Sequence, residues 1–201
     1  MISSLIVFVK NPMEGHVKTR IAATTGHAKA VEIYKELLLH TRDTIGEFLQ
    51  ELDKKQEVRL HIFYGDYLNT SDLWNELPVS KYLQSGQDLG QRMAHAFHTA
   101  FGEGAKKAVI IGSDCLLLRP THLQQAFDWL EKHEVVIGPA TDGGYYLLGM
   151  KKLYQTLFEN KPWSQSNLLD KTLHDLKGIP HTFLETLSDI DTWQDYQKAK
   201  A

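Results

Sequence analysis

The sequence has one cysteine, six prolines and no long apolar run among its 201 residues. A single cysteine excludes an internal disulfide framework and is typical of proteins in a reducing cytosol. The apolar run near the N-terminus, residues 5–9, is too short for a membrane span or for the apolar core of a signal peptide. We therefore expect a soluble cytoplasmic protein.

The chain also lacks an excess of charge of either sign, since 22 basic and 25 acidic residues give a formal net charge of −3. Such a chain has no overall basic field to hold a polyanion, so nucleic acid is not an expected partner. The 42% hydrophobic content is that of an ordinary globular protein. Because the sequence shows no internal repeat or long linker, residues 1–201 are expected to form a single domain.

The stretch that organises the chain is a short β-branched apolar run, residues 109–111, which stops at Gly112 and leads into Ser113 and Asp114. A run this short and this apolar indicates a central parallel strand that is buried on both faces. Ligands of open α/β sheets bind just beyond the carboxyl ends of such strands. Asp114 is thus placed where a carboxylate can hold a divalent cation over a phosphate, although an aspartate after a strand often only caps a turn.

The spacing of apolar residues predicts further strands and helices in alternation along the chain. The expected strands cover residues 3–9, 58–64, 82–83, 135–138 and 180–184, and the expected helices cover residues 28–52, 89–101, 120–130 and 168–176.

The segment after the first predicted strand carries three cations, Lys10, Lys18 and Arg20, within eleven residues. A proline and Gly15 force a loop there, and glycine lets backbone N–H groups come close to an anion. The loop matches neither the Walker A sequence nor the dinucleotide-binding glycine pattern. Three charges in a loop are often only solvated, but their place at the same sheet edge as Asp114 favours an anionic ligand.

Asp88 is predicted to cap a helix that begins at the next residue, and Arg92 falls on the first turn of that helix. Two interpretations remain open. The helix N-terminus and Arg92 face the crevice and bind a ligand, or the helix is an ordinary capped helix whose neighbouring glycines serve packing.

Asp142, Gly143 and Gly144 are predicted to form a tight turn between two strands. The turn fits a simple hairpin. The two glycines and the following Tyr145 also make a surface that a substrate can approach closely, and the turn alone does not decide between these interpretations.

Two interpretations also remain open for the aspartates near the C-terminus, Asp189 and Asp191. Asp191 is a candidate helix N-cap, with Gln194 completing a capping box. The alternative is that Asp191 or Asp189 reaches the same cation as Asp114.

Taken together, these stretches resemble the DUF2064 family of bacterial glycosyltransferase-like proteins, from about residue 5 to residue 197. The chain departs from the family at Leu116, where proline is usual, and at Met13 and Glu14, which occupy an often proline-rich position. The motifs that carry the resemblance occur in the family's order: Phe8-x-Lys10-x-Pro12-x-x-Gly15-x-Val17-Lys18-Thr19-Arg20, Gln87-Asp88-Leu89-Gly90-x-Arg92-Met93, Gly112-Ser113-Asp114-Cys115, Gly138-Pro139-x-x-Asp142-Gly143-Gly144-Tyr145 and Asp189-x-Asp191-Thr192.

The resemblance implies the GT-A-like fold of the nucleotide-diphospho-sugar transferase superfamily. This α/β fold is a three-layer α/β/α sandwich around a central, mostly parallel sheet. The resemblance also implies a nucleotide or nucleotide-sugar donor and a small-molecule acceptor. By analogy with the superfamily's acidic motif, Asp114 is the metal-binding carboxylate, with Asp191 or Asp189 as the second ligand of a Mg²⁺ or Mn²⁺ ion.

The other candidate site residues take two roles in this scheme. Asp142 and Tyr145 are expected to position or deprotonate the acceptor hydroxyl. The residues expected to bind the nucleotide and its phosphates are Lys10, Gly15, Lys18, Arg20, Asp88, Arg92, Ser113, Gly143 and Gly144.

Two transfer reactions fit these residues. Glycosyl transfer releases a nucleoside diphosphate and needs one metal, whereas nucleotidyl transfer attacks the α-phosphate of a triphosphate and releases pyrophosphate. The cluster of Lys10, Lys18 and Arg20 favours nucleotidyl transfer, and the family label favours glycosyl transfer. A non-catalytic nucleotide-binding protein on the same fold is a third candidate.

Overall fold

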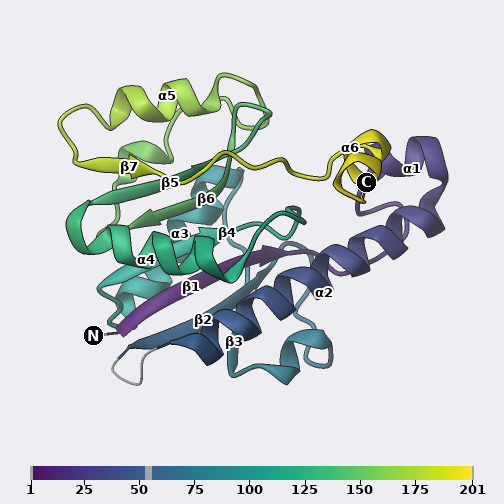
Figure 1. Cartoon of the computed structure of the whole chain (residues 1–201), viewed down its shortest axis with the longest axis horizontal. Helices are drawn as coiled ribbons and strands as arrows, with labels where there is room; N and C mark the ends of the chain where they lie inside the picture. The colour runs from purple at the N-terminus through teal and green to yellow at the C-terminus, as the bar shows by residue number, and fades with distance from the viewer. Residues whose placement is uncertain (1, 53–55, 201) are drawn as a thin grey trace.

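A seven-stranded sheet forms the middle of the protein, with the strand order β3-β2-β1-β4-β6-β5-β7 (Figure 1). The computed structural model describes residues 2–52 and 56–200. Within these residues the strands are β1 (Ile2–Val9), β2 (Glu57–Tyr64), β3 (Val79–Leu83), β4 (Lys107–Ile111), β5 (Val135–Pro139), β6 (Tyr145–Met150) and β7 (His181–Phe183). The strands predicted from apolar runs are therefore confirmed, with β3 longer than expected.

The sheet is mostly parallel, as predicted. Strand β6 alone runs against its neighbours β4 and β5, and the other strand pairs in the described part of the chain are parallel. The tight turn at residues 142–144 joins β5 to β6 as a hairpin. Because β6 is reversed, its first residue lies at the same edge of the sheet as the carboxyl ends of β1 and β4.

Helices cover both faces of the sheet, which makes the predicted three-layer arrangement. Helices α2 (His27–Glu51) and α4 (Pro120–Lys132) pack on one face, and α3 (Leu89–Gly102) and α5 (Leu168–Asp175) pack on the other (Figure 1). The remaining helical elements are α1 (Thr19–Thr25), α6 (Trp193–Lys200) and the 3₁₀ turns Leu73–Glu76 and Gln155–Leu157. None of the helices in the described ranges has both the length and the apolarity needed to cross a membrane.

The alternation of side chains along β1 explains why the sheet has two cores. Leu5 and Val7 point toward α2 and α4, whereas Ile6 points toward α3, where Phe97 packs. All five residues of β4 are buried. A strand covered on both faces needs apolar residues at successive positions, which is the pattern that predicted it.

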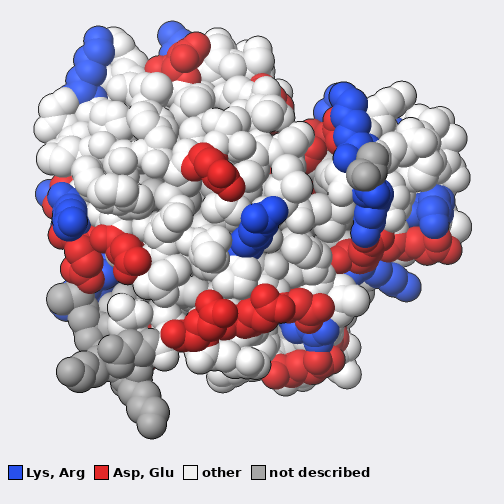
Figure 2. Space-filling view, in the orientation of Figure 1, with Lys and Arg blue, Asp and Glu red and all other residues white. Residues whose placement is uncertain are grey.

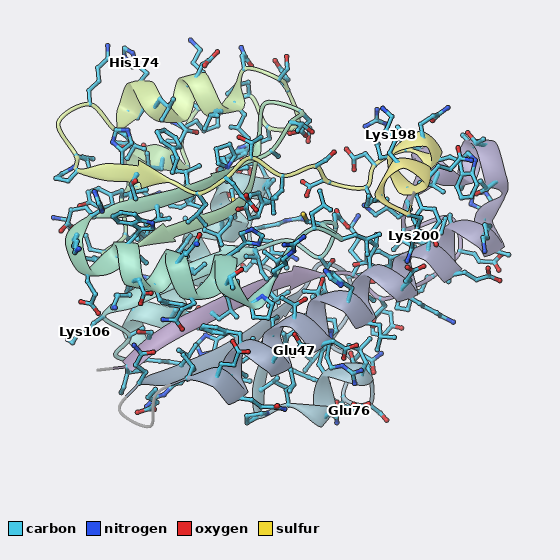
Figure 3. The ribbon with its side chains drawn as sticks, viewed as in Figure 1. Glu47, Glu76, Lys106, His174, Lys198 and Lys200 are labelled. Atoms are coloured by element: carbon cyan, nitrogen blue, oxygen red, sulfur yellow. The ribbon has the colours of Figure 1, made fainter. Side chains whose placement is uncertain are left out.

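Helix α1 was not predicted, and α6 was indicated only by a candidate N-cap near its start; the two helices lie together at one end of the molecule (Figure 1). Lys200 of α6 reaches down to α2 and pairs with Glu36, which also accepts a hydrogen bond from Tyr196 at 2.7 Å (Figure 3). The segment from residue 184 to residue 192, which we name the C-terminal strap, connects β7 to α6 across the sheet edge (Figure 1). The docking of α6 therefore fixes the far end of the strap.

The face shown in Figure 2 carries a band of acidic side chains over α2. Exposed acidic residues of this helix are Asp43, Glu47 and Glu51, and Figure 3 places Glu47 on its outer side. This face would repel a polyanion, which agrees with the small negative net charge.

A buried histidine in β2 makes the stability of the fold depend on pH. The His61 ring is fully buried, 5.5 Å from the Tyr82 ring, and its Nε2 lies 3.4 Å from the Glu103 carboxylate. Burial lowers the pKa of His61, and the nearby Glu103 only partly opposes this effect. The folded protein therefore takes up this proton at a lower pH than the unfolded chain does.

We predict that the free energy of unfolding falls as the pH drops below about 6.5, the ordinary pKa of histidine, because the unfolded chain then binds a proton that the folded protein excludes. In a His61→Phe variant the decrease between pH 7 and pH 5 should be smaller by on the order of 1 kcal/mol. Urea unfolding at a series of pH values measures this difference. Parallel pH profiles of the two proteins would contradict the assignment.

Candidate active site

A cavity of about 730 Å³ opens at the sheet edge where β1 and β4 end and β6 begins. Its wall combines the loop after β1, the residues after β4, the β5–β6 turn, the first turn of α3 and the C-terminal strap. Eleven of the residues singled out from the sequence line it: Lys10, Lys18, Arg20, Arg92, Ser113, Asp114, Asp142, Gly144, Tyr145, Asp189 and Asp191.

Lys18 lies at the centre of the charged part of the cavity. Its Nζ is 2.8 Å from Asp114 Oδ1 and 3.8 Å from Asp191 Oδ1, and it donates a hydrogen bond to the Ile190 carbonyl at 2.7 Å. The Lys18 side chain is only 7% exposed. Its backbone is left-handed, with φ 47° and ψ 44°, just before the first residue of α1. The lysine predicted to contact phosphate is therefore engaged by both candidate metal ligands.

The C-terminal strap brings Asp189 and Asp191 to Asp114. The Ile190 N–H donates to the Asp114 carbonyl at 2.8 Å, so the two aspartates flank a residue that is bonded directly to the end of the β4 segment. Arg20 contacts Asp191 at 3.2 Å from the open side. These contacts join the first, middle and last parts of the chain at one point.

Of the two interpretations left open for Asp191, the helix N-cap is wrong. Helix α6 begins at Trp193, and the reciprocal hydrogen bonds of a capping box join Thr192 and Asp195: the Asp195 N–H donates to Thr192 Oγ1 at 3.2 Å, and the Thr192 N–H donates to Asp195 Oδ2 at 2.7 Å. The capping residue comes one position later than expected. The Asp191 carboxylate is therefore free to face the cavity.

Asp189 has the more perturbed carboxyl group of the pair on the strap. Its burial, followed by the repulsion of the nearby Asp114 carboxylate, raises the pKa of Asp189 to about 7, and the Lys18 ammonium only partly offsets this. The side chain of Asp191 is 43% exposed, close to the 42% of Asp114. In its exposure to solvent, Asp191 is therefore more similar to Asp114 than Asp189 is.

The carboxylates on the cavity wall fit a hard divalent cation that takes its remaining ligands from substrate phosphates and water. Within residues 2–52 and 56–200, no three His, Cys, Asp or Glu side chains converge as a complete metal site. Mg²⁺ is usually held by one or two carboxylates together with substrate phosphates and waters, so an all-protein cage is not required. Asp114 and Asp191 supply two such carboxylates on the cavity wall.

The loop after β1 is held in place from two sides. The Lys10 N–H donates to the Tyr34 hydroxyl at 2.9 Å, and this hydroxyl is 3.3 Å from Ser113 Oγ. The buried Asn11 side chain donates to the Asp66 carboxylate at 2.8 Å. Tyr34 of α2 thus ties the loop after β1 to the residues after β4, while the Lys10 side chain stays exposed. The sequence analysis did not single out Tyr34.

Three of the residues predicted to bind the ligand do not line the cavity, namely Gly15, Asp88 and Gly143. Gly15 is exposed in its loop. Asp88 caps α3 by accepting a hydrogen bond from the Gln91 N–H at 2.8 Å, so the simpler of its two interpretations accounts for it. Arg92 does line the cavity, and its Nε donates to the Gly86 carbonyl at 3.1 Å.

Gly143, the third of these residues, serves packing. A Cβ at Gly143 would overlap the Ser166 carbonyl, and the Gly143 carbonyl accepts a hydrogen bond from the Leu169 N–H at 2.9 Å. A Cβ at Gly90 would likewise overlap the Trp163 ring. The two glycines let residues 162–168 approach closely and form a cavity wall that the sequence analysis missed, with Trp163, Ser164, Gln165 and Leu168 on the cavity.

The two candidates for acceptor chemistry differ in exposure. The Tyr145 hydroxyl is buried and has no hydrogen-bond partner among residues 2–52 and 56–200, and burial strongly raises the pKa of Tyr145. This placement does not favour Tyr145 as a proton acceptor. Asp142 is exposed on the cavity wall, and its Oδ1 accepts the Gly144 N–H at 2.9 Å.

The fold and the site define a class of protein that comparison with solved structures also identifies. The crystal structure of a protein assigned as a nucleotide-diphospho-sugar transferase from Desulfovibrio desulfuricans is 30% identical, with a TM-score of 0.81 over 94% of this chain and 82% of that one. CMP:2-keto-3-deoxy-manno-octonic acid synthetase complexed with CTP shares the fold at 9% identity, with a TM-score of 0.57 over 100% and 97% of the two chains. Rv0371c from Mycobacterium tuberculosis, in complex with manganese, does so at 14% identity, with a TM-score of 0.51 over 98% and 97%.

The protein thus has the α/β fold shared by nucleotide-diphospho-sugar transferases and nucleotidyltransferases. It belongs to the DUF2064 family, described as uncharacterized proteins conserved in bacteria, whose family model matches residues 48–165. The resemblance inferred from the motifs is confirmed. No curated protein matches the chain by sequence.

The packing role of Gly143 predicts that Gly143→Ala destabilises the protein much more than a glycine substitution in open space does. Gly104 is the matched control, because its φ of +92° is close to the +90° of Gly143 and its Cβ would meet nothing. Gly104→Ala should cost about 1 kcal/mol of unfolding free energy for its backbone conformation. Gly143→Ala should cost about 2 kcal/mol more because of the overlap with Ser166. Denaturant unfolding compares the two variants, and equal losses would contradict the close approach of the 162–168 wall.

Proposed function

We propose that the protein is a divalent-metal-dependent transferase that takes a nucleoside-diphosphate sugar as donor and transfers the sugar to a small-molecule acceptor. The observation that carries the proposal is the convergence of Asp114, Asp191 and the cations of the loop after β1 on one cavity. The similarity to the Desulfovibrio protein assigned as a nucleotide-diphospho-sugar transferase supports the choice of donor.

The charged part of the cavity is suited to a diphosphate. Lys10 is exposed there, and Arg20 is 69% exposed, so both can turn to phosphate oxygens. The planar guanidinium of arginine fits phosphate with two parallel hydrogen bonds. Asp114 and Asp191 would hold Mg²⁺ or Mn²⁺, which when bound supplies positive charge to the leaving diphosphate. The manganese complex of the mycobacterial relative supports a cation of this kind.

The acceptor is assigned to the side of the cavity formed by the β5–β6 turn and the 162–168 wall. Asp142 is the proposed base there, because its carboxylate is exposed on the cavity wall. In the transfer, the acceptor oxygen bonds to the anomeric carbon, the bond from that carbon to the donor phosphate breaks, and the acceptor proton passes to Asp142. The nucleoside diphosphate leaves with its electron pair.

Nucleotidyl transfer is the second candidate, and the clustering of Lys10, Lys18 and Arg20 on the cavity favours it. A triphosphate carries more negative charge than a diphosphate sugar and would use more cations. The similarity to the Desulfovibrio protein assigned as a nucleotide-diphospho-sugar transferase is why we place glycosyl transfer first.

A thermal-shift panel of nucleoside mono-, di- and triphosphates and nucleotide sugars, with and without Mg²⁺, tests the proposal. A ligand that binds the folded state raises its melting temperature. We expect a metal-dependent stabilisation by one nucleotide sugar, followed by release of nucleoside diphosphate when an acceptor is added. Metal-dependent binding without any turnover would instead identify a nucleotide-binding protein.

In the Asp114→Asn variant, the affinity for nucleotide in the presence of the metal should fall by about tenfold or more, while the fold is kept. The fold survives because the main-chain carbonyl of Asp114, and not its carboxylate, accepts the hydrogen bond from Ile190. Calorimetric titration with Mn²⁺ plus the selected nucleotide measures the effect. Asp43→Asn, which removes one exposed carboxylate of α2, is the control and should bind as the wild type does. Wild-type affinity of Asp114→Asn would show that Asp114 is only a turn residue.

Lys10→Ala and Arg20→Ala should each weaken binding of the nucleoside diphosphate by about tenfold and of the monophosphate by much less, because they remove charge from the terminal phosphate. Lys106→Ala is the control, since this exposed lysine precedes β4 at the opposite edge of the sheet. The two candidate reactions separate by product: nucleoside diphosphate for glycosyl transfer and pyrophosphate for nucleotidyl transfer. Unchanged affinities of both variants for all the nucleotides would remove the phosphate role of this loop.

A further inference from the structure

Three oxygen atoms surround the Lys18 ammonium. Asp114 Oδ1 is 2.8 Å away, the Ile190 carbonyl oxygen is 2.7 Å away and Asp191 Oδ1 is 3.8 Å away. Carboxylate and main-chain carbonyl oxygens are the ligands that hard divalent cations prefer. The ammonium therefore occupies an oxygen-lined position that would also suit a divalent ion.

The backbone of Lys18 holds the ammonium in this position. A non-glycine residue at φ 47° is unfavourable by comparison with the right-handed region, so the surrounding structure must stabilise the conformation. The first residue of α1 follows directly, and the lysine side chain is directed into the protein, where it is 7% exposed. A glycine would adopt this backbone more easily but would supply no charge.

Lys18 and a divalent ion cannot share the two carboxylates. An ammonium and a metal ion a few ångströms apart repel each other strongly in the partly buried interior of a protein. A phosphate that enters the cavity would give Lys18 another anionic partner, because Lys18, Lys10 and Arg20 all lie on the wall. The flexible lysine stem allows the ammonium to turn from carboxylate to phosphate.

We propose that Lys18 is an internal counter-cation that the divalent metal must displace, so that metal alone binds weakly and metal and nucleotide bind together. The proposal rests on the proposed function for the identity of the nucleotide, but it makes its own prediction about metal binding. It assigns Lys18 a positioning role: the residue prevents the carboxylates from capturing metal before the donor arrives. By linkage, the nucleotide and the metal each raise the affinity for the other by the same factor.

Titration with Mn²⁺ alone, followed by calorimetry, tests the proposal without nucleotide. Lys18→Met removes the charge and keeps the length, and Lys18→Gln also keeps an N–H donor. Both variants should bind Mn²⁺ about tenfold or more tightly than the wild type, because the competing charge is gone. Lys18→Arg should bind no more tightly than the wild type. Lys10→Met is the matched control for loss of one cation at the same sheet edge and should change the affinity by less than about threefold.

A measurement on the wild-type protein covers the case in which the variants do not fold. Native acylation of lysines, read by mass spectrometry, should label Lys18 slowly without Mn²⁺ and at least about fivefold faster with saturating Mn²⁺, because the displaced ammonium becomes accessible. Lys107 is the control, because its side chain is similarly shielded but is paired with Glu131 at the other end of β4. Its labelling should not change.

The proposal is overturned if Lys18→Met and Lys18→Gln bind Mn²⁺ no more tightly than Lys10→Met, or if saturating Mn²⁺ leaves the labelling of Lys18 unchanged. A negative nucleotide panel would overturn the proposed function while leaving these Mn²⁺ results readable. The two failures are therefore distinguishable.

Discussion

The ion pair between Lys18 and Asp114 is the contact on which the arrangement of the site depends. A lysine side chain this buried is stable only with partners for its charge and its N–H groups, and Asp114, Asp191 and the Ile190 carbonyl are those partners. The same contact fixes the loop after β1 against the end of β4. The cations and the carboxylates of the cavity are thus held at one place by a single side chain.

The C-terminal strap carries two of the partners of Lys18, the Ile190 carbonyl and Asp191. Its backbone bonds to β5 through Leu184 and Leu187 and to the residue after β4 through Ile190, and α6 then anchors it on α2. An aspartate on a free loop would have many positions, but an aspartate on a strap with main-chain bonds on both sides has few. The strap therefore gives Asp191 a defined place on the cavity wall, although Asp191 belongs to no strand or helix.

The sequence predicted the features that depend on local spacing. Apolar runs identified the buried strands, and the charged residues after β1 and β4 were correctly assigned to one sheet edge. The features it did not reveal come from long-range contacts. Ile190, whose carbonyl is one partner of Lys18, lies 172 residues away. The wall at residues 162–168 depends on Gly90 and Gly143 accepting close neighbours. Of the two interpretations left open for Asp191, the helix cap is wrong, because the next residue, Thr192, caps α6 instead.

Because the strap follows all the strands in the sequence, we expect the site to form after most of the sheet. Contacts between residues that are distant in the sequence form late, since a long loop must close before they are made. Once β1 to β6 have been synthesised, most of the strands of the sheet can already pair. The carboxylate pair of the cavity is still incomplete, because Asp191 has not yet been added to Asp114. The chain acquires its candidate active site only when residues 184–192 emerge and the strap crosses the sheet edge. A nascent or C-terminally shortened chain would have a nearly complete fold and an unassembled site.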